Sequence, residues 1–226
     1  MVYRNASLAA AILLSVAATP LFAQSDTSAP APSIPPAGTY TTDPAHTRVS
    51  ISLDHLGFST YTFYFRKFEG TLIFDPDKPE TMQLTASVDP ASVETLYPDA
   101  TYDFNGVISG EQFLDARKFP ELTFKSTRVR LTAPHEAAVT GDLTLHGITR
   151  PVTLHVRYNG GYAGNPLDPG GARIGFSAEG AIFRSDFGMA FGIPAPGTTM
   201  GVGDLVALHI ETELNNPDAP GVQVGP

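Results

Sequence analysis

Histidine is the residue type in this sequence best suited to chemistry near neutral pH, as a metal ligand or as a general base. The histidines are His46, His55, His135, His146, His155 and His209. No two of them have the spacing of a metal-binding motif, and there is no cysteine to complete a zinc or iron–sulfur site. We therefore predict lone capping or surface histidines, with no metal and no cofactor. A metal site would have to be assembled by the fold.

Nucleophilic and acid–base motifs are equally sparse. The segment 175–179 around Ser177 lacks the second glycine of a nucleophile elbow and lies within a strand pattern. Residues 201–204 contain two glycines but precede no helix, so they do not form a dinucleotide-binding loop. Glu211 and Glu213 lie on the polar face of an expected strand, where solvated charge is usual. These patterns predict that the protein is not an enzyme.

Composition narrows the class of protein further. The chain has 226 residues, and 42% of them are hydrophobic, which suffices for a core. There are 14 basic and 23 acidic residues, and a net charge of -9 is the wrong sign for binding a phosphate backbone. We therefore expect no nucleic-acid partner. The 21 glycines, 20 prolines and 14 phenylalanines, with no tryptophan, favour many turns and β structure.

The N-terminal segment has the features of an export signal. Residues 1–23 combine a basic start at Arg4, an apolar run over 8–18 and a small residue, Ala23, at the expected cleavage site. The apolar run is about half of the ~20 residues that a membrane-spanning helix needs. We therefore predict a signal peptide and a periplasmic protein that is not an integral membrane protein.

Two further segments lie outside the expected domain. Residues 24–38 are rich in Ser, Ala and Pro, which predicts a linker. Residues 215–226 have the same Pro/Gly character and predict a disordered tail. A single domain is then expected over residues 39–214.

Within this domain, apolar and polar residues alternate in segments 49–54, 82–88, 139–145, 152–158, 174–182 and 206–214. In the first of these, Val49, Ile51 and Leu53 alternate with polar residues, as in a strand with one solvent-facing side. Segments 61–74 and 122–131 are strand-like, but their apolar residues occur at both parities, which predicts burial on two sides. The pattern favours an antiparallel barrel or a two-sheet sandwich and does not choose between them.

Short turns join several of these segments. Residues 74–79 and 145–151 each separate two alternating runs, so the flanking strands should be antiparallel neighbours. The longest interruption, residues 92–120, has room for one or two short helices. Its best helical candidate is the segment 110–114.

A series of phrases in this domain resembles the YceI-like family of secreted, lipocalin-like proteins. The phrases are residues 40–47, 55–59, 68–72, 113–120, 123–126, 141–152 and 184–189, in the family's order. They include His46, His55, Arg184 and Asp186. The resemblance covers essentially residues 39–214.

This resemblance implies an all-β fold, an eight-stranded antiparallel lipocalin-like barrel with a short helical insertion. It also implies an apolar tunnel that holds a polyisoprenoid or another long-chain lipid. Residues of apolar parity would line the tunnel: Val49, Ile51, Leu53, Phe63, Phe65, Leu84, Phe124, Leu143, Leu154, Phe176, Ile182 and Leu208. The polar motif residues His46, His55, Arg184 and Asp186 would order the tunnel mouth or contact a lipid head group.

The function expected on this basis is that of a periplasmic lipid-binding or carrier protein, in envelope lipid traffic or stress response. Two alternatives remain at this point. One is a small outer-membrane β-barrel, although the strands here run nearer seven residues than the roughly ten such a barrel uses. The other is an enzyme acting on a lipid-like substrate, which would need a polar cluster inside the barrel. The oligomeric state stays open, a homodimer included.

Overall fold

The computed structural model describes residues 34–164, 168 and 170–219. The chain divides into two units, residues 1–31 and 32–226, and all described residues belong to the second. The predicted signal peptide and most of the predicted linker lie outside the described residues, as do residues 220–226. Within the described part, the first strand begins at Gly38 and the last ends at Asn216, so the sheet extends slightly beyond the predicted limits of 39 and 214.

Nearly all of the regular structure is β. The strands are β1 (Gly38–Thr42), β2 (Arg48–His55), β3 (Ser59–Phe65), β4 (Phe68–Phe74), β5 (Gln83–Val88), β6 (Val93–Glu94), β7 (Leu122–Ala133), β8 (Glu136–Leu145), β9 (Ile148–Tyr162), β10 (Ala172–Phe183) and β11 (Val202–Asn216). The helices are α1 (Phe104–Ser109) and the 3-10 turns η1 (Pro44–His46), η2 (Pro79–Thr81), η3 (Pro90–Ser92) and η4 (Arg184–Phe187).

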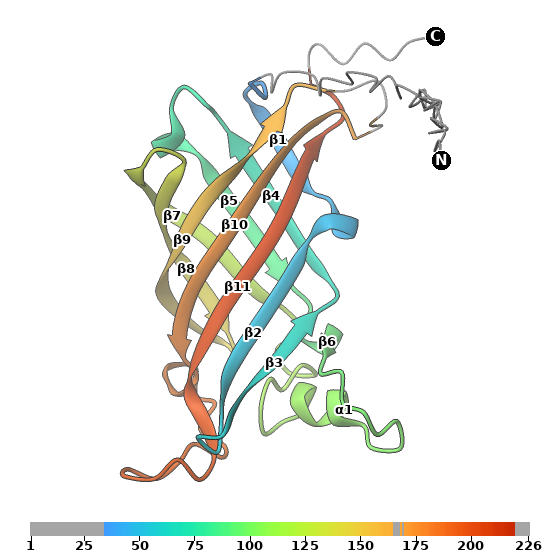
Figure 1. Cartoon of the computed structure of the whole chain (residues 1–226), viewed down its shortest axis with the longest axis vertical. Coiled ribbons are helices and arrows are strands. Elements are labelled where there is room, and N and C mark those ends of the chain that lie inside the picture. The colour runs from blue at the N-terminus through green and yellow to red at the C-terminus, as the bar shows by residue number, and fades with distance from the viewer. Residues whose placement is uncertain (1–33, 165–167, 169, 220–226) are drawn as a thin grey trace, which may run out of the picture. The chain divides into compact units, whose positions relative to one another are not determined.

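These strands form a closed antiparallel barrel of eight long strands (Figure 1). β1 and β2 both pair with β11. On their other side, β1 pairs with β4 and β2 pairs with β3. β4 then pairs with β5, and β3 pairs with β6. β1 with β2, β3 with β4, and β5 with β6 therefore form three long strands, each with one interruption. Together with the five continuous strands β7 to β11, they give 3 + 5 = 8 in the described part of the chain. The predicted eight-stranded barrel is confirmed, and the sandwich is excluded because β1 closes the sheet onto β11.

The interruptions switch which residues face inward. In β3, Phe63 and Phe65 are buried and Tyr64 is half-exposed, whereas in β4 Leu72 and Phe74 are buried. The two residues between β3 and β4 leave the ladder, so the inward positions change from odd to even numbers. The prediction that segment 61–74 is buried on two sides was therefore wrong.

In segment 122–131 the mixed parity of the apolar residues also comes from a change of inward face within the strand. A β-bulge between Ser126 and Arg128 in β7 shifts the register against β8. Phe124 and Ser126 face the interior before the bulge, and Val129 and Leu131 line it afterwards. Both parities are apolar because the strand changes face.

The two ends of the barrel carry different connections. The lower end in Figure 1 carries the β2–β3 turn, α1 and the long β10–β11 connection, and the upper end carries the β4–β5 and β7–β8 connections. α1 begins after Asp103, whose carboxylate accepts a hydrogen bond from the Gly106 amide at 2.8 Å, and it ends before Gly110. A short helix was predicted in this interruption, but at residues 110–114, which form turns.

The β8–β9 hairpin was predicted correctly. Leu145 pairs with Ile148 across a two-residue turn in which His146 and Gly147 both have positive φ, at 52° and 75°. Such a turn matches the right-handed twist of the strands. A Cβ atom on Gly147 would lie 2.5 Å from a ring carbon of Phe119, so this turn requires glycine for space as well as for conformation.

Candidate functional site

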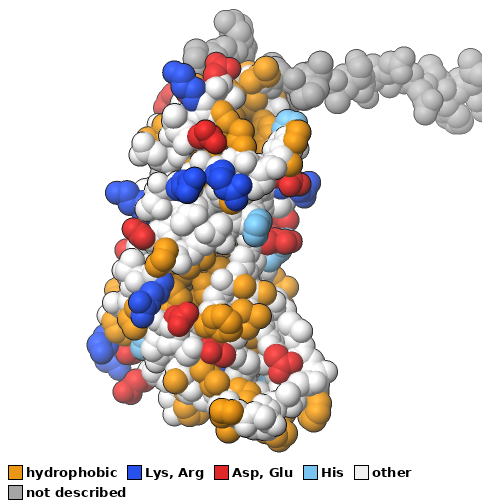
Figure 2. Space-filling model, turned by 90° about the vertical axis from the view of Figure 1, so that its left-hand side faces the viewer, with side chains coloured by type: hydrophobic (Ala, Val, Ile, Leu, Met, Phe, Trp, Pro, Cys, Tyr) orange, Lys and Arg blue, Asp and Glu red, His pale blue; other side chains and the backbone are white. Residues whose placement is uncertain are grey.

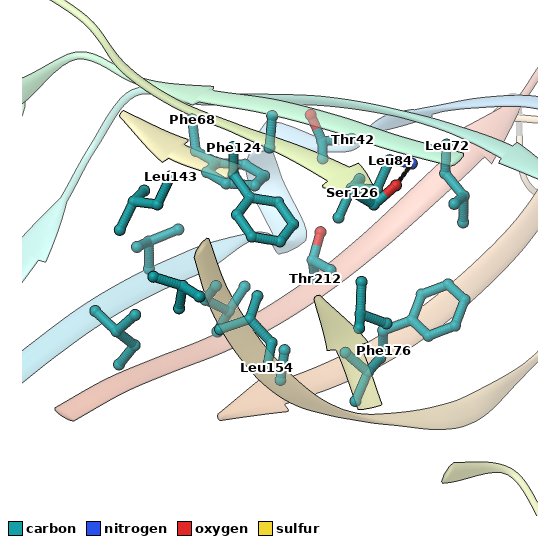
Figure 3. Close-up of a pocket in the computed structure, with 18 of the residues that line it drawn as sticks. Thr42, Phe68, Leu72, Leu84, Phe124, Ser126, Leu143, Leu154, Phe176 and Thr212 are labelled. Carbon is teal, nitrogen blue, oxygen red and sulfur yellow. Dashed lines mark hydrogen bonds between the residues drawn. The ribbon is translucent and has the colours of Figure 1, made fainter. Parts of the chain in front are cut away.

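The barrel encloses a cavity of about 800 Å³. Figure 3 shows side chains from different strands, among them Phe124, Leu143, Leu154 and Phe176, directed into one space. The interior is apolar because each long strand turns its apolar parity inward. Volumes of this order are typical of pockets that bury small organic ligands.

All twelve residues predicted to line a tunnel contribute to this cavity. They come from β2, β3, β5, β7, β8, β9, β10 and β11: Val49, Ile51, Leu53, Phe63, Phe65, Leu84, Phe124, Leu143, Leu154, Phe176, Ile182 and Leu208. Strand parity was sufficient to place those in the cleanly alternating segments on the inner face, whereas Phe63, Phe65 and Phe124 lie in segments of mixed parity. Their contact with a ligand stays a prediction.

Other lining residues were missed. Val129 and Leu131 follow the bulge in β7, where the inward parity has changed. Ile108, Phe113 and Leu114 come from the interruption between β6 and β7, which has no strand pattern. The N-cap residue before α1 was the available signal for this helix. No local pattern predicts that the residues at its C-terminal end line the cavity of a barrel.

Hydroxyl groups interrupt the apolar lining in one part of the cavity. Thr42, Ser126 and Thr212 lie in this part of the cavity (Figure 3). Thr42 Oγ1 accepts from the Gly70 amide at 3.1 Å, and Ser126 Oγ accepts from the Leu84 amide at 2.8 Å. The hydroxyls of Thr42 and Ser126 therefore satisfy backbone amides near the strand interruptions.

The cavity opens at the upper end of the barrel. There its lining includes exposed residues of the β7–β8 connection, Pro134 and His135, and Leu131, which is 46% exposed. Pro76 and Pro79 of the β4–β5 connection also contribute. These lining residues reach solvent, so this end forms the entrance.

Buried side chains close the lower end. Ile108, Leu114 and Met189 line the cavity and are each less than a tenth exposed. Arg184 joins them at only 4% exposure. Its Nε donates to Gly203 O at 2.9 Å. Its Nη1 and Nη2 donate at 2.8 Å to the carbonyl oxygens of Met189, Phe191 and Val202.

The other polar residues predicted at a mouth lie elsewhere. His46 is exposed on η1, His55 is exposed at the lower end of β2, and Asp186 is exposed on η4. None of these three lines the cavity within the described residues. Arg184 does line it, but at the closed floor. The structure thus separates four residues that their shared motif character had grouped at one mouth.

One cluster has the composition of a metal site. Ligand atoms of Asp43, His46 and Glu213 lie within 4.8 Å of one another. Arg173 already supplies a cation there, because its Nη1 lies 2.7 Å from Asp43 Oδ2 and 2.6 Å from Glu213 Oε2. The hydrogen bond from Arg173 lowers the pKa of Asp43 to about 2. The arrangement is an ion-pair network that ties β10 to η1 and β11.

Within the described residues, no helix has both the length and the apolar character needed to cross a membrane.

Comparison with known proteins is consistent across sequence and structure. The model of the YceI-like domain matches residues 40–214. A UPF0312 protein of Pseudomonas savastanoi pv. phaseolicola is 37% identical over 161 residues, which cover 71% of this chain and 78% of the relative.

Two solved structures share the fold. BcnA of Burkholderia cenocepacia has a TM-score of 0.64 at 25% identity, covering 76% of this chain and 98% of that protein. A polyisoprenoid-binding domain from Saccharophagus degradans has a TM-score of 0.56 at 12% identity, covering 80% of this chain and 99% of the domain, and shows the fold alone. With a family match across nearly the whole described barrel, this chain belongs to the YceI-like domain family.

Proposed function

We propose that this protein is a periplasmic carrier that holds a polyisoprenoid or another long-chain lipid inside its barrel, in the service of envelope lipid traffic. The observation that carries the proposal is the cavity of about 800 Å³ with an apolar lining, one entrance and a closed floor. The S. degradans domain, which has the same fold, is described as polyisoprenoid-binding. Export rests on the sequence of residues 1–23 alone.

Hydrophobic burial supplies the binding energy in such a site. Each methylene that leaves water contributes roughly 0.8 kcal/mol, so a long chain gains affinity along its whole length. Little directional bonding is needed, which agrees with the few polar side chains in the lining. Selectivity would then depend mainly on the length and width of the chain.

A lipid-modifying enzyme is less well supported. Ser177 is buried, but its hydroxyl donates to Glu211 Oε2 at 2.7 Å and accepts from Asn159 Nδ2 at 2.9 Å. Among the described residues no histidine bonds to it, so the base of a hydrolase triad is missing. The hydroxyls of Thr42 and Ser126 accept bonds from backbone amides instead.

The distribution of side chains also favours a carrier over an outer-membrane barrel. Membrane barrels turn apolar residues outward to lipid and polar residues inward. Here the inner face is apolar, and the wall shown in Figure 2 carries acidic and basic side chains spread over its outer surface. The alternation is therefore the reverse of that in a membrane barrel.

The proposal is tested by native mass spectrometry of the mature protein, purified from a bacterial periplasm without detergent. We expect a stoichiometric adduct that solvent extraction identifies as an isoprenoid or fatty-chain lipid. A mass that stays that of the bare protein after addition of polyprenyl lipids and fatty acids would contradict the proposal.

A pair of variants ties the adduct to the cavity. Ala178 is buried and lines the cavity, whereas Glu179 is exposed on the next position of β10. Ala178→Trp places an indole in the lipid space, so the adduct should be lost while the circular dichroism spectrum stays that of a β-barrel. Glu179→Trp adds the same side chain outside and should keep the adduct. Retention of the adduct by both variants would place the lipid elsewhere.

A further inference from the structure

Arg184 is an unusual residue for the floor of an apolar cavity. It is 4% exposed, and no other charged side chain lines the closed end within the described residues. A buried charge is normally paired with an opposite charge, because burial of an ion in an apolar interior is costly. Among the described residues, Arg184 instead donates only to backbone carbonyl oxygens.

Asp204, an acidic group with an electrostatic effect on Arg184, does not pair with it. The carboxylate of Asp204 accepts from the Ser185 amide at 2.8 Å and from the Ser185 hydroxyl at 2.7 Å. No carboxylate of the described residues forms an ion pair with Arg184. Burial accordingly lowers the pKa of Arg184, and Asp204 offsets this only in part. The floor therefore carries a positive charge that is compensated only in part.

The guanidinium also has bonding capacity left. It has five N–H groups, and the four bonds to Gly203, Met189, Phe191 and Val202 leave one N–H on Nη2 without an acceptor among the described residues. At the opposite end, the entrance is lined by Glu136, whose negative charge would repel an anion. Charge thus differs in sign between the two ends of the lining.

We infer that Arg184 forms the head-group subsite of the cavity and that the preferred occupant is a long-chain carboxylic acid, bound with its carboxylate at the floor and its methyl end toward the entrance. This inference rests on the proposed lipid-binding function and specifies the ligand class and its orientation. The carboxylate supplies the missing counter-charge and accepts the remaining N–H.

The first test compares ligands and leaves the protein unchanged. Delipidated mature protein is titrated with oleic acid and oleyl alcohol at pH 8, where the acid is ionised. A charge-assisted hydrogen bond contributes about 1.5 kcal/mol or more, so the acid should bind at least about tenfold more tightly. Equal affinity overturns the inference and leaves the lipid-binding function intact. Failure of both chains to bind overturns both.

The second test measures orientation. Because the chain has no tryptophan, one can be introduced at the floor as Phe113→Trp or near the entrance as Tyr158→Trp. Phe113 packs against Phe191, whose carbonyl oxygen accepts from Arg184, and Tyr158 stacks on His135. Stearic acid with a nitroxide near its carboxyl end should quench the floor tryptophan more strongly than the entrance tryptophan. A nitroxide near the methyl end should give the reverse. The opposite pattern would show that the head lies at the entrance and overturn the inference.

Discussion

The ring of Phe124 lies directly over Gly141 of the neighbouring strand, inside the cavity. A Cβ atom on Gly141 would be 2.4 Å from Phe124 Cζ and 2.6 Å from the carbonyl oxygen of Lys125. Glycine at this position lets the Phe124 ring pack closely against the inner wall of the barrel. The width of the cavity at this level therefore depends on the absence of one methyl group.

Replacing Gly141 tests this relationship. Gly141→Ala forces the ring of Phe124 into the cavity and strains the contact with Lys125, so we expect a loss of about 1–3 kcal/mol in the free energy of unfolding. Bound lipid should decrease as well. Gly175→Ala is the control, because a Cβ there would lie 3.7 Å from its nearest neighbour. Urea unfolding and native mass spectrometry measure both effects, and similar losses in the two variants would contradict this account.

The ion-pair network of Arg173 predicts a specific dependence of stability on pH. Arg173 holds the pKa of Asp43 near 2 and that of Asp168 well below its ordinary range. A carboxyl group with a lowered pKa stabilises the fold above its unfolded pKa, near 4, and loses this contribution as pH falls through its folded pKa. We expect Arg173→Met to lose about 2 kcal/mol in urea unfolding at pH 7.

The difference between wild type and Arg173→Met should shrink as pH falls from 4 toward 2, because over this range Asp43 takes up a proton in the unfolded chain and in the variant, whereas in the folded wild type it does so only as pH nears 2. A difference that stays constant over this range would show that Arg173 acts by packing and not through its charge. Arg48→Met is a suitable control, since within the described residues the Arg48 guanidinium donates hydrogen bonds only to the carbonyl oxygens of Ala45 and Thr47.

Arg184 should fix the β10–β11 connection, whatever ligand is bound. Arg184→Met leaves the carbonyl oxygens of Met189, Phe191, Val202 and Gly203 without their donor. We expect a loss on the order of 3 kcal/mol in stability and faster proteolysis within residues 188–201. Arg150→Met is the matched control, because exposed Arg150 makes one 3.4 Å bond to Asp186 O. Unchanged proteolysis in Arg184→Met would rule out this role.

The interruption between β3 and β4 should be essential to the register of the barrel. Deleting both Arg66 and Lys67 would continue the alternation of β3 directly into β4 and turn Leu72 and Phe74 outward, whereas these side chains are buried in the native barrel. We expect the deletion variant to be insoluble or molten. Deleting Asp77, in the connection between β4 and β5, should be tolerated. Far- and near-ultraviolet circular dichroism of both variants measures the outcome, and a folded deletion of Arg66 and Lys67 would contradict the parity switch.

Local patterns were sufficient where a strand runs without interruption. Leu143, Leu154 and Leu208 lie on strands whose inward parity follows from alternation, and all three line the cavity. The turn at His146 and Gly147 was equally readable, because its residue types suit positive φ.

Other features depend on contacts distant in sequence. The changes of face in β4 and β7 require residues that leave the ladder, and alternation alone shows only mixed parity there. The separation of Arg184 from His46 has the same origin. Strand order places one at the floor and the other on the outer wall, whereas their shared motif character says nothing of distance.

The closed floor also has a kinetic consequence. A lipid chain held in this cavity would enter and leave through the upper end, moving lengthwise along its own axis. Each further methylene inside adds roughly 0.8 kcal/mol to what must be returned to water, so escape slows about fourfold per carbon. Residence time would then discriminate between chain lengths far more sharply than the rate of capture, and any acceptor of the lipid must approach the entrance formed beside Pro134 and His135.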